Sequence, residues 1–332
     1  MIRAEALTKE FRKYERRPGL RGSLGTLFSR KYETHRAVDN ISFTVEAGAK
    51  MAYLGANGAG KSTTIKMLAG ITTPTSGRCL VNGIEPYLNR RANAQSIGVV
   101  FGQRTQLWWD LSVPDSFRIL QRIYDIPEKV YRRNLRLFQE YLDIDALAST
   151  QVRKLSLGQR MRAEIAASLL HDPKVVFWDE PTIGLDVILK DAVRELINHF
   201  NRELGTTVLL TSHDIGDITS ICDQVLVVDR GKVIHQGTLQ ELISTAAYRS
   251  ISFECGRQDL AAAVAAIEEA LPKAIATAAG GHRIRVDYPI DHLTSKEVLS
   301  CLLERFDITD FYAPEPELGS VVREIYGTGK TA

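Results

Sequence analysis

The sequence predicts an α/β fold in which helices cover a mostly parallel sheet, followed by a small α+β domain. The first observation is a set of short apolar runs, typical of parallel strands covered on both faces: Val99–Phe101, Val175–Trp178, Val208–Leu210 and Val225–Val228. The second is a set of amphipathic patterns that predict helices at Val113–Tyr124, Glu128–Leu142, Gln159–Leu170 and Leu189–Leu204. The third is a change of pattern past Leu242, which indicates a second domain.

Composition sets the limits of this prediction. At 332 residues, 44% of them hydrophobic, the chain can form one large core and a smaller second one. No apolar run approaches the roughly 20 residues that a membrane-spanning helix needs. The charged start, Met1–Glu5, leads us to expect an intracellular protein. The four cysteines are scattered without metal-ligand spacing, and a net charge of +2 does not indicate nucleic acid as a partner.

The order of elements follows from the same patterns. From Ile2 to Val45 we expect strands interrupted by an irregular insert at about residues 12–36, and from Ala49 to Leu54 a buried strand. The end of the chain predicts a strand at Ser250–Phe253, a helix at Asp259–Leu271, a strand near Ile284–Val286, a helix at Ser295–Glu304 and a strand near Ile308–Tyr312. This order is typical of a split β-α-β domain. We therefore expect domains at residues 1–244 and 245–332.

A glycine-rich segment follows the buried strand and precedes a helix. It reads Gly55, Ala56, Asn57, Gly58, Ala59, Gly60, Lys61, Ser62 and then Thr63, which fits the phosphate-binding pattern G-x-x-x-x-G-K-S. Glycines let the backbone N–H groups approach a triphosphate closely. Lys61 is expected to reach the β- and γ-phosphates, and the Ser62 hydroxyl to ligate Mg²⁺ at the helix N-terminus. The segment predicts a site for a nucleoside triphosphate and Mg²⁺.

Two carboxylates end the apolar strand Val175–Trp178. Asp179 is placed to reach the Mg²⁺ shell, and Glu180 to polarise the water that attacks the γ-phosphate. An acidic pair at a strand end is ordinarily an exposed turn. Downstream of a phosphate-binding loop, this pair instead predicts a hydrolytic site.

A second loop of small residues, Leu155-Ser156-Leu157-Gly158-Gln159, opens another helix. With this motif the chain resembles the ATP-binding subunits of ABC transporters over roughly residues 1 to 240. The resemblance implies a P-loop NTPase fold of the ABC ATPase type, with an antiparallel β subdomain and a helical subdomain at about residues 104–170. It also implies that Ser156, Gly158 and Gln159 bind the ATP held by a partner copy. Leu157 replaces the usual glycine, so we expect a right-handed or extended backbone there.

The same resemblance assigns further site residues. Gln103 matches the glutamine that touches Mg²⁺ and faces the membrane subunit, and Asp186 lies in the loop that crosses the dimer interface. His213 matches the histidine that contacts the γ-phosphate. Phe11 falls where an aromatic ring stacks on adenine; a core phenylalanine is the alternative, and Tyr14 is a rival for the role.

The branch of the family is also indicated. The run Val100–Leu111 is similar to ATPases of type 2 ABC exporters, most of all a viologen and multidrug exporter group. Trp108 and Trp109 lie where that family docks a permease helix, or else they are buried in the helical subdomain. The basic insert at about residues 12–36 would contact permease or anionic lipid, or would be a solvated loop.

The resemblance implies an ATPase that dimerises head to tail around two ATP–Mg²⁺ and drives a separate membrane permease. Such a subunit lies on the cytoplasmic, inner face of the cell membrane. The alternative is a soluble ABC ATPase that acts on ribosomes or nucleic acid; proteins of that kind usually carry two P-loop domains or long coiled coils, which this chain lacks. The C-terminal domain is expected to dimerise or regulate.

Overall fold

The computed structural model describes residues 1–14, 32–102, 104–212, 214–255, 259–280 and 282–314, with Pro316, Leu318, Gly319, Val321 and Val322. The chain divides into two compact units, Met1–Gly237 and Thr238–Ala332. The division lies closer to the N-terminus than the boundary expected at residue 244. Helix α9 (Leu239–Ser244) belongs to the second unit, and Thr238 begins it because its Oγ1 accepts a hydrogen bond from Glu241 N at 3.1 Å.

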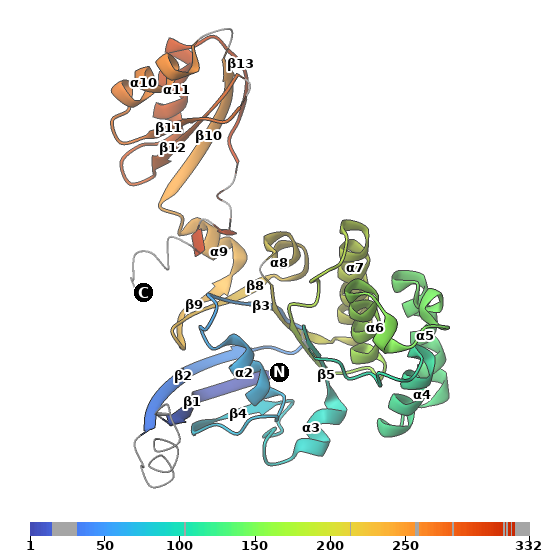
Figure 1. Cartoon of the computed structure of the whole chain (residues 1–332). Helices are drawn as coiled ribbons and strands as arrows, with labels where there is room; N and C mark the ends of the chain where they lie inside the picture. Colours follow the sequence, from blue (N-terminus) through green and yellow to red (C-terminus); the bar gives the residue numbers. More distant parts are fainter. Residues whose placement is uncertain are drawn as a thin grey trace, which may run out of the picture. The chain divides into compact units, whose positions relative to one another are not determined.

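An antiparallel sheet forms the first part of the larger unit (Figure 1). It contains β1 (Ile2–Tyr14), β2 (Tyr32–Val45) and β4 (Ser76–Val81), in the order β2-β1-β4. This is the predicted antiparallel subdomain. Most of the basic insert, residues 15–31, lies outside the described residues.

A six-stranded sheet forms the centre of the larger unit. Its order is β5 (Ile97–Phe101), β6 (Val175–Asp179), β7 (Thr207–Thr211), β3 (Lys50–Gly55), β8 (Gln224–Asp229) and β9 (Lys232–Thr238). The pairs β5·β6, β6·β7, β7·β3 and β3·β8 are parallel, and each predicted apolar run lies in one of these strands. Since neighbouring parallel strands end at the same edge, the carboxyl ends of β3, β6 and β7 meet there.

Among the described residues of the larger unit, the helices are α2 (Lys61–Leu68), α3 (Arg90–Ser96), α4 (Val113–Ile123), α5 (Glu128–Leu142), α6 (Leu157–Leu169), α7 (Val187–Leu204) and α8 (Ile215–Ile221), with 3₁₀ turns at Ile144–Leu147 and Val152–Lys154. Helices α4, α5 and α6 pack together as the helical subdomain (Figure 1). Helices α6 and α7 begin earlier than predicted because Ser156 and Asp186 cap them.

The smaller unit has its own core. After α9 come β10 (Tyr248–Cys255), α10 (Leu260–Ala270), β11 (Ile275–Ala278), β12 (Arg283–Pro289), α11 (Ser295–Arg305) and β13 (Ile308–Tyr312). The antiparallel sheet order β11-β12-β10-β13 confirms the split β-α-β prediction. Strand β11 was not predicted, because Ile-Ala-Thr-Ala has no apolar run and forms a strand only by pairing with β12. Within the described part of the chain, no helix combines the length and apolar character needed to cross a membrane.

Candidate functional site

The glycine-rich loop connects β3 to α2, and its glycines are required by the local geometry. Gly58 and Gly60 have φ angles of 84° and 100°, in the left-handed region that other residues rarely adopt. A Cβ on Gly60 would lie 2.3 Å from the Ala37 carbonyl oxygen, and one on Gly55 would lie 2.8 Å from that of Val228. Only glycine fits at these positions, and the loop therefore leads tightly into the N-terminus of α2, where N–H groups lack partners within the helix.

An open cavity of about 710 Å³ lies over this loop. Its lining is formed by Phe11, His35, Ala37, Ala56, Asn57, Gly58, Gly60, Lys61, Ser62, Thr63, Lys66, Phe101, Gly102, Arg104, Asp179, Glu180 and Ile183. The volume is in the range of small-molecule and cofactor sites. Gly55 and Ala59 are not in the lining, and Ala59 is buried.

Phe11 lies in the cavity lining with 44% of its surface exposed, which argues against the alternative of a core phenylalanine. The ammonium of Lys9 lies 5.3 Å from the centre of its ring. The side chain of Tyr14, the rival candidate, lies outside the described residues. Phe11 therefore presents a ring on which a planar base could stack.

Lys61 lies at the floor of the cavity. Its Nζ donates hydrogen bonds to the carbonyl oxygens of Gly55 at 2.6 Å and Ala56 at 3.2 Å. Burial lowers the pKa of Lys61, and the charges of Glu180 and Asp179 oppose that shift. The ammonium group is thus held beside the loop, where a phosphate oxygen would replace carbonyl partners.

Asp179 joins three elements. Its Oδ2 accepts a hydrogen bond from Ser62 Oγ at 2.8 Å, and its Oδ1 accepts one from Thr211 Oγ1 at 2.7 Å. The hydroxyl of Ser62 and the carboxylate of Asp179 are hard oxygen donors that suit Mg²⁺, which commonly takes one or two protein ligands besides phosphates and water. Among the described residues no cluster of three or more His, Cys, Asp or Glu forms a metal cage, and Mg²⁺ bound with a nucleotide does not need one.

Glu180 follows the last residue of β6 and lines the cavity. Its φ of 58° is unusual for a residue other than glycine; such a conformation costs about 1–3 kcal/mol and persists only where its surroundings enforce it. Two hydrogen bonds from Glu180 N, to Thr211 O at 3.1 Å and Thr211 Oγ1 at 3.2 Å, hold it. Strain of this kind clusters at functional sites.

The second loop lies outside this cavity lining. Ser156 and Gln159 form a reciprocal cap of α6: Gln159 N donates to Ser156 Oγ at 3.2 Å, and Ser156 N donates to Gln159 Oε1 at 2.9 Å. Leu157 is the first residue of the helix, which confirms the right-handed backbone expected there. A Cβ on Gly158 would lie 2.7 Å from the Gly184 carbonyl oxygen, so the loop packs closely on the turn that follows Glu180.

Asp186 caps α7, where its Oδ1 accepts a hydrogen bond from Leu189 N at 2.9 Å. Apolar side chains near this turn and the second loop are exposed: Leu157, Ile183, Val187 and Ile188. Trp108 and Trp109 are 37% and 52% exposed, so burial of both rings is excluded. The Arg160 guanidinium lies 5.7 Å from the ring centre of Trp109.

Gln103 and His213 lie outside the described residues, but their neighbours are placed. Gly102 N donates to Asp179 O at 3.1 Å, and Ser212 follows the last residue of β7. Thr211, the partner of both Asp179 and Glu180, was not predicted from the sequence. The one feature of the sequence that could have indicated Thr211 is a hydroxyl residue at the end of β7, the strand that pairs with β6.

Comparisons with known proteins show what the chain is similar to. Residues 38–183 match the sequence family described as ABC transporter. The chain is 31% identical over 215 residues to the ABC transporter ATP-binding protein NatA of Bacillus subtilis, covering 65% of this chain and 87% of NatA. It is 34% identical over 216 residues to the probable multidrug ABC transporter ATP-binding protein YbhF of Escherichia coli, covering 64% of this chain but only 36% of YbhF. It is 30% identical over 226 residues to the methionine import ATP-binding protein MetN of Latilactobacillus sakei, covering 67% of this chain and 65% of MetN.

Solved structures share the fold. An ATP-binding subunit of an ABC transporter superposes with a TM-score of 0.63 at 23% identity, covering 73% of this chain and 92% of that one. The dimeric bacterial ABC transporter cassette MJ0796 gives a TM-score of 0.60 at 22% identity, covering 72% of this chain and 98% of that one. At these identities the likeness concerns the fold.

Proposed function

This chain belongs to the family of ABC transporter ATP-binding proteins, the subunits that hydrolyse ATP to drive transport, and we propose that it serves an exporter whose permease is a separate chain. The similarity to a multidrug transporter protein supports export, although a methionine importer is also among its relatives. The exposed Trp108 and Trp109 support a separate permease, because exposed aromatic pairs are effective anchors for a partner helix. A permease would hold the chain at the inner, cytoplasmic face of the cell membrane.

The observation that carries the proposal is the single cavity that contains Lys61, Ser62, Asp179 and Glu180. Lys61 and the loop N–H groups bind the phosphates, and Phe11 stacks on the adenine. Ser62 Oγ and the Asp179 carboxylate would hold Mg²⁺, which when bound would neutralise charge on the β- and γ-phosphates. Glu180 accepts a hydrogen bond from the attacking water and raises its nucleophilicity.

Gln103 and His213 complete the proposed site. In the sequence, Gln103 follows Gly102, whose N donates a hydrogen bond to Asp179 O, and His213 follows Ser212, the residue after the last residue of β7. We assign Gln103 to the Mg²⁺ shell and to communication with the permease. His213 holds the charge that develops on the γ-phosphate.

A head-to-tail dimer would complete each site. Ser156 and Gly158 do not line the cavity of their own chain, which supports a role on the nucleotide of a partner copy. The neighbouring exposed apolar side chains, Ile183, Val187 and Ile188 among them, would be covered in such a dimer. Asp186 would lie at the interface. Because the Gln159 side chain caps α6, its contribution would be to shape the loop that meets the phosphate.

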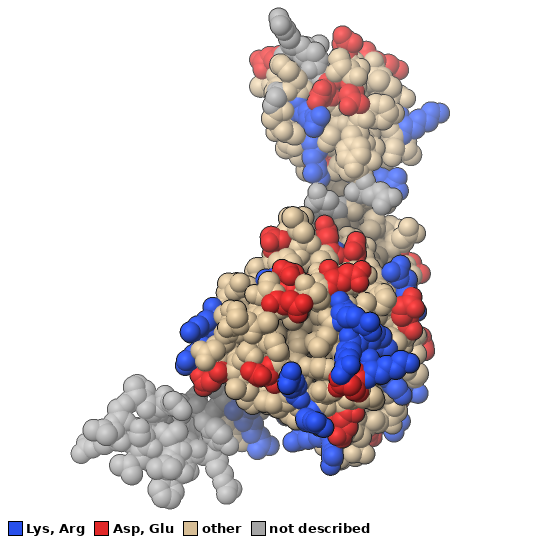
Figure 2. Space-filling view, turned by 90° about the vertical axis from the view of Figure 1, so that its right-hand side faces the viewer, with Lys and Arg blue, Asp and Glu red and all other residues tan. Residues whose placement is uncertain are grey.

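The alternative function is action on ribosomes or nucleic acid without transport. Figure 2 shows the side of the larger unit on which α4 and α5 lie, where basic side chains gather in a patch with acidic side chains beside it. The names of the relatives, which are ATP-binding proteins of ABC transporters, favour the transport function.

The test is the pair of variants Glu180→Gln and Glu203→Gln. Glu203 is an exposed glutamate near the end of α7 and serves as the matched control. Loss of a positioned base lowers turnover by about 100- to 10,000-fold, so Glu180→Gln should bind ATP and hardly hydrolyse it, while Glu203→Gln behaves as the parent. Turnover of Glu180→Gln at the parent rate would refute the assignment of Glu180.

A further inference from the structure

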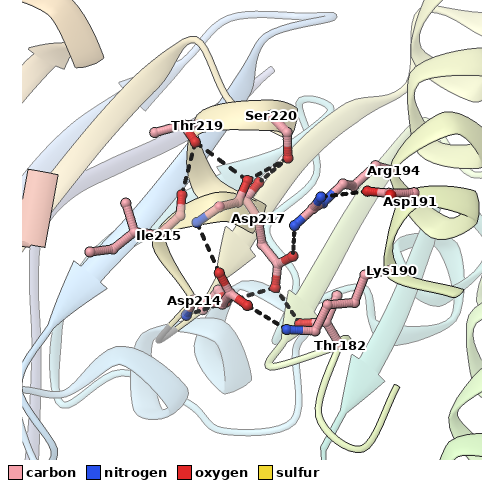
Figure 3. Close-up of polar contacts among 11 residues, drawn as sticks. Thr182, Lys190, Asp191, Arg194, Asp214, Ile215, Asp217, Thr219 and Ser220 are labelled. Carbon is pink, nitrogen blue, oxygen red and sulfur yellow. Dashed lines mark hydrogen bonds and ion pairs between the residues drawn. The ribbon is translucent and has the colours of Figure 1, made fainter. Parts of the chain in front are cut away.

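A buried carboxylate, Asp217 of α8, lies between two loops that border the site (Figure 3). Its side chain has no exposed surface. Its Oδ2 accepts hydrogen bonds from Thr182 Oγ1 and, at 3.3 Å, from Ser212 Oγ. Its Oδ1 accepts one from Arg194 Nη2 of α7 at 2.7 Å. The carboxylate is therefore bound by groups from three separate segments of the chain.

Two of these segments carry proposed catalytic groups. Thr182 lies two positions after Glu180, in the turn that continues to the Gly184 contact with the second loop, and it is buried. Ser212 directly precedes His213 in the sequence and is also buried. A single carboxylate thus fixes the turn after Glu180 and the start of the loop that contains His213.

The surrounding ion pairs orient this carboxylate. A buried carboxylate is costly unless a positive charge and hydrogen bonds compensate it, and Arg194 supplies the charge. Arg194 also donates to Asp191 Oδ1 at 2.6 Å, but that carboxylate is largely exposed. Lys190 pairs with Asp214, which itself accepts a hydrogen bond from Gly216 N at 2.9 Å and caps α8 (Figure 3).

We propose that Asp217 is a positioning residue for ATP hydrolysis, which holds the turn after Glu180 and the loop before His213 in one fixed arrangement. Asp217 does not line the cavity and does not contact the phosphates. Its action is to keep the Glu180 carboxylate and His213 in register with the γ-phosphate. The inference rests on the proposed function, because it presumes the roles of Glu180 and His213.

The test separates positioning from simple stability. Asp217→Asn keeps the size of the side chain but removes its charge, and Thr182→Val removes one hydroxyl without changing the shape. Both should lower kcat by about 10- to 100-fold, the range found when a group that orients a functional ligand is lost. The dissociation constant of ATP should not change, because the phosphate-binding loop is untouched. Thr182→Ser restores the hydroxyl and should restore kcat.

Asp191→Asn is the matched control, since it removes the other partner of Arg194 on the exposed side. It should leave kcat at the parent value. The double variant Asp217→Asn with Thr182→Val should be no slower than the slower single variant, because the contact that Thr182→Val removes is one of those that Asp217→Asn disrupts. Thermal midpoints of all variants show whether the protein is folded at the assay temperature.

The inference is wrong if folded Asp217→Asn keeps the parent kcat, or if Thr182→Ser is as slow as Thr182→Val. It is also wrong if the ATP dissociation constant rises by the same factor as kcat falls. Glu180→Gln, measured in the same assay, distinguishes failure of this inference from failure of the proposed function. If Glu180→Gln is inactive and Asp217→Asn is not impaired, the inference alone fails; if Glu180→Gln turns over normally, the proposed function fails.

Discussion

His171 is predicted to make the larger unit lose stability in mild acid. It follows the end of α6, and its ring stacks on Tyr124, with ring centres 4.1 Å apart and planes at 12°. Its Nε2 donates to the Ile97 carbonyl oxygen at 3.0 Å, which leaves Nδ1 unprotonated. This Nδ1 is buried and has no partner among the described residues. A second proton would therefore place a buried charge between the helical subdomain and β5, which the nearby Asp172 offsets only in part because burial dominates the pKa shift.

The magnitude follows from the pKa. Burial lowers the pKa of the imidazole to about 4, from an ordinary value of 6.5. Between these two values the unfolded chain binds more protons than the native one, so stability is lost as the pH falls from 6.5 towards 4. The linkage relation gives a loss of about 2 kcal/mol between pH 7 and pH 5 from this one group.

Urea unfolding followed by tryptophan fluorescence measures the effect, because Trp108, Trp109 and Trp178 all lie in the larger unit. The parent is compared with His171→Gln, which can still donate to the Ile97 carbonyl but does not titrate. Between pH 7 and pH 5, the free energy of unfolding should fall by about 2 kcal/mol less in His171→Gln than in the parent. The control His292→Gln changes an exposed histidine. If the free energy of unfolding falls equally in His171→Gln and in the parent, His171 is not the source of the acid sensitivity.

Three further predictions concern the site and its supports. Lys61→Ala should weaken ATP binding about 10- to 100-fold in a calorimetric titration, because a charge-assisted phosphate contact is lost; unchanged affinity would contradict its role. Gly158→Ala places a Cβ 2.7 Å from the Gly184 carbonyl oxygen, so kcat should fall with little change in ATP affinity, and an unimpaired variant would show that the close approach is dispensable. Glu164 accepts a hydrogen bond from Gln106 N at 3.2 Å, yet burial raises its pKa, so its native form binds the proton more tightly than the unfolded one. The free energy of unfolding contributed by this group should therefore fall as the pH rises through its native pKa, and Glu164→Gln should lack that decrease in denaturation curves measured across the range.

Local sequence signals were sufficient for the elements that position the nucleotide. The glycine-rich loop was predictable because Gly58 and Gly60 need left-handed backbone and because Lys61 and Ser62 follow at fixed spacing. Helix ends were less predictable. The cap at Asp186 starts α7 two residues before the first residue that the apolar pattern indicated.

Features that depend on contacts between distant segments could not be predicted. Strand β11 is held by β12 rather than by its own apolar pattern. The unit boundary falls at Gly237 because α9 packs with the second unit. Thr182 and Asp217 lie 35 positions apart, and neither stands in a motif with a fixed spacing to the other. Their pairing follows only from the three-dimensional arrangement of β6, β7 and α8.

The head-to-tail dimer around ATP is tested most directly by the mass of Glu180→Gln, measured by sedimentation with and without ATP and Mg²⁺. We expect a dimer that forms only with ATP–Mg²⁺. Adding Ser156→Asp should return it to a monomer without loss of ATP binding, because aspartate still caps α6 but repels the phosphates of the partner's nucleotide. A Glu180→Gln chain that stays monomeric with saturating ATP, or a dimer that forms without ATP and ignores Ser156→Asp, would contradict the head-to-tail site.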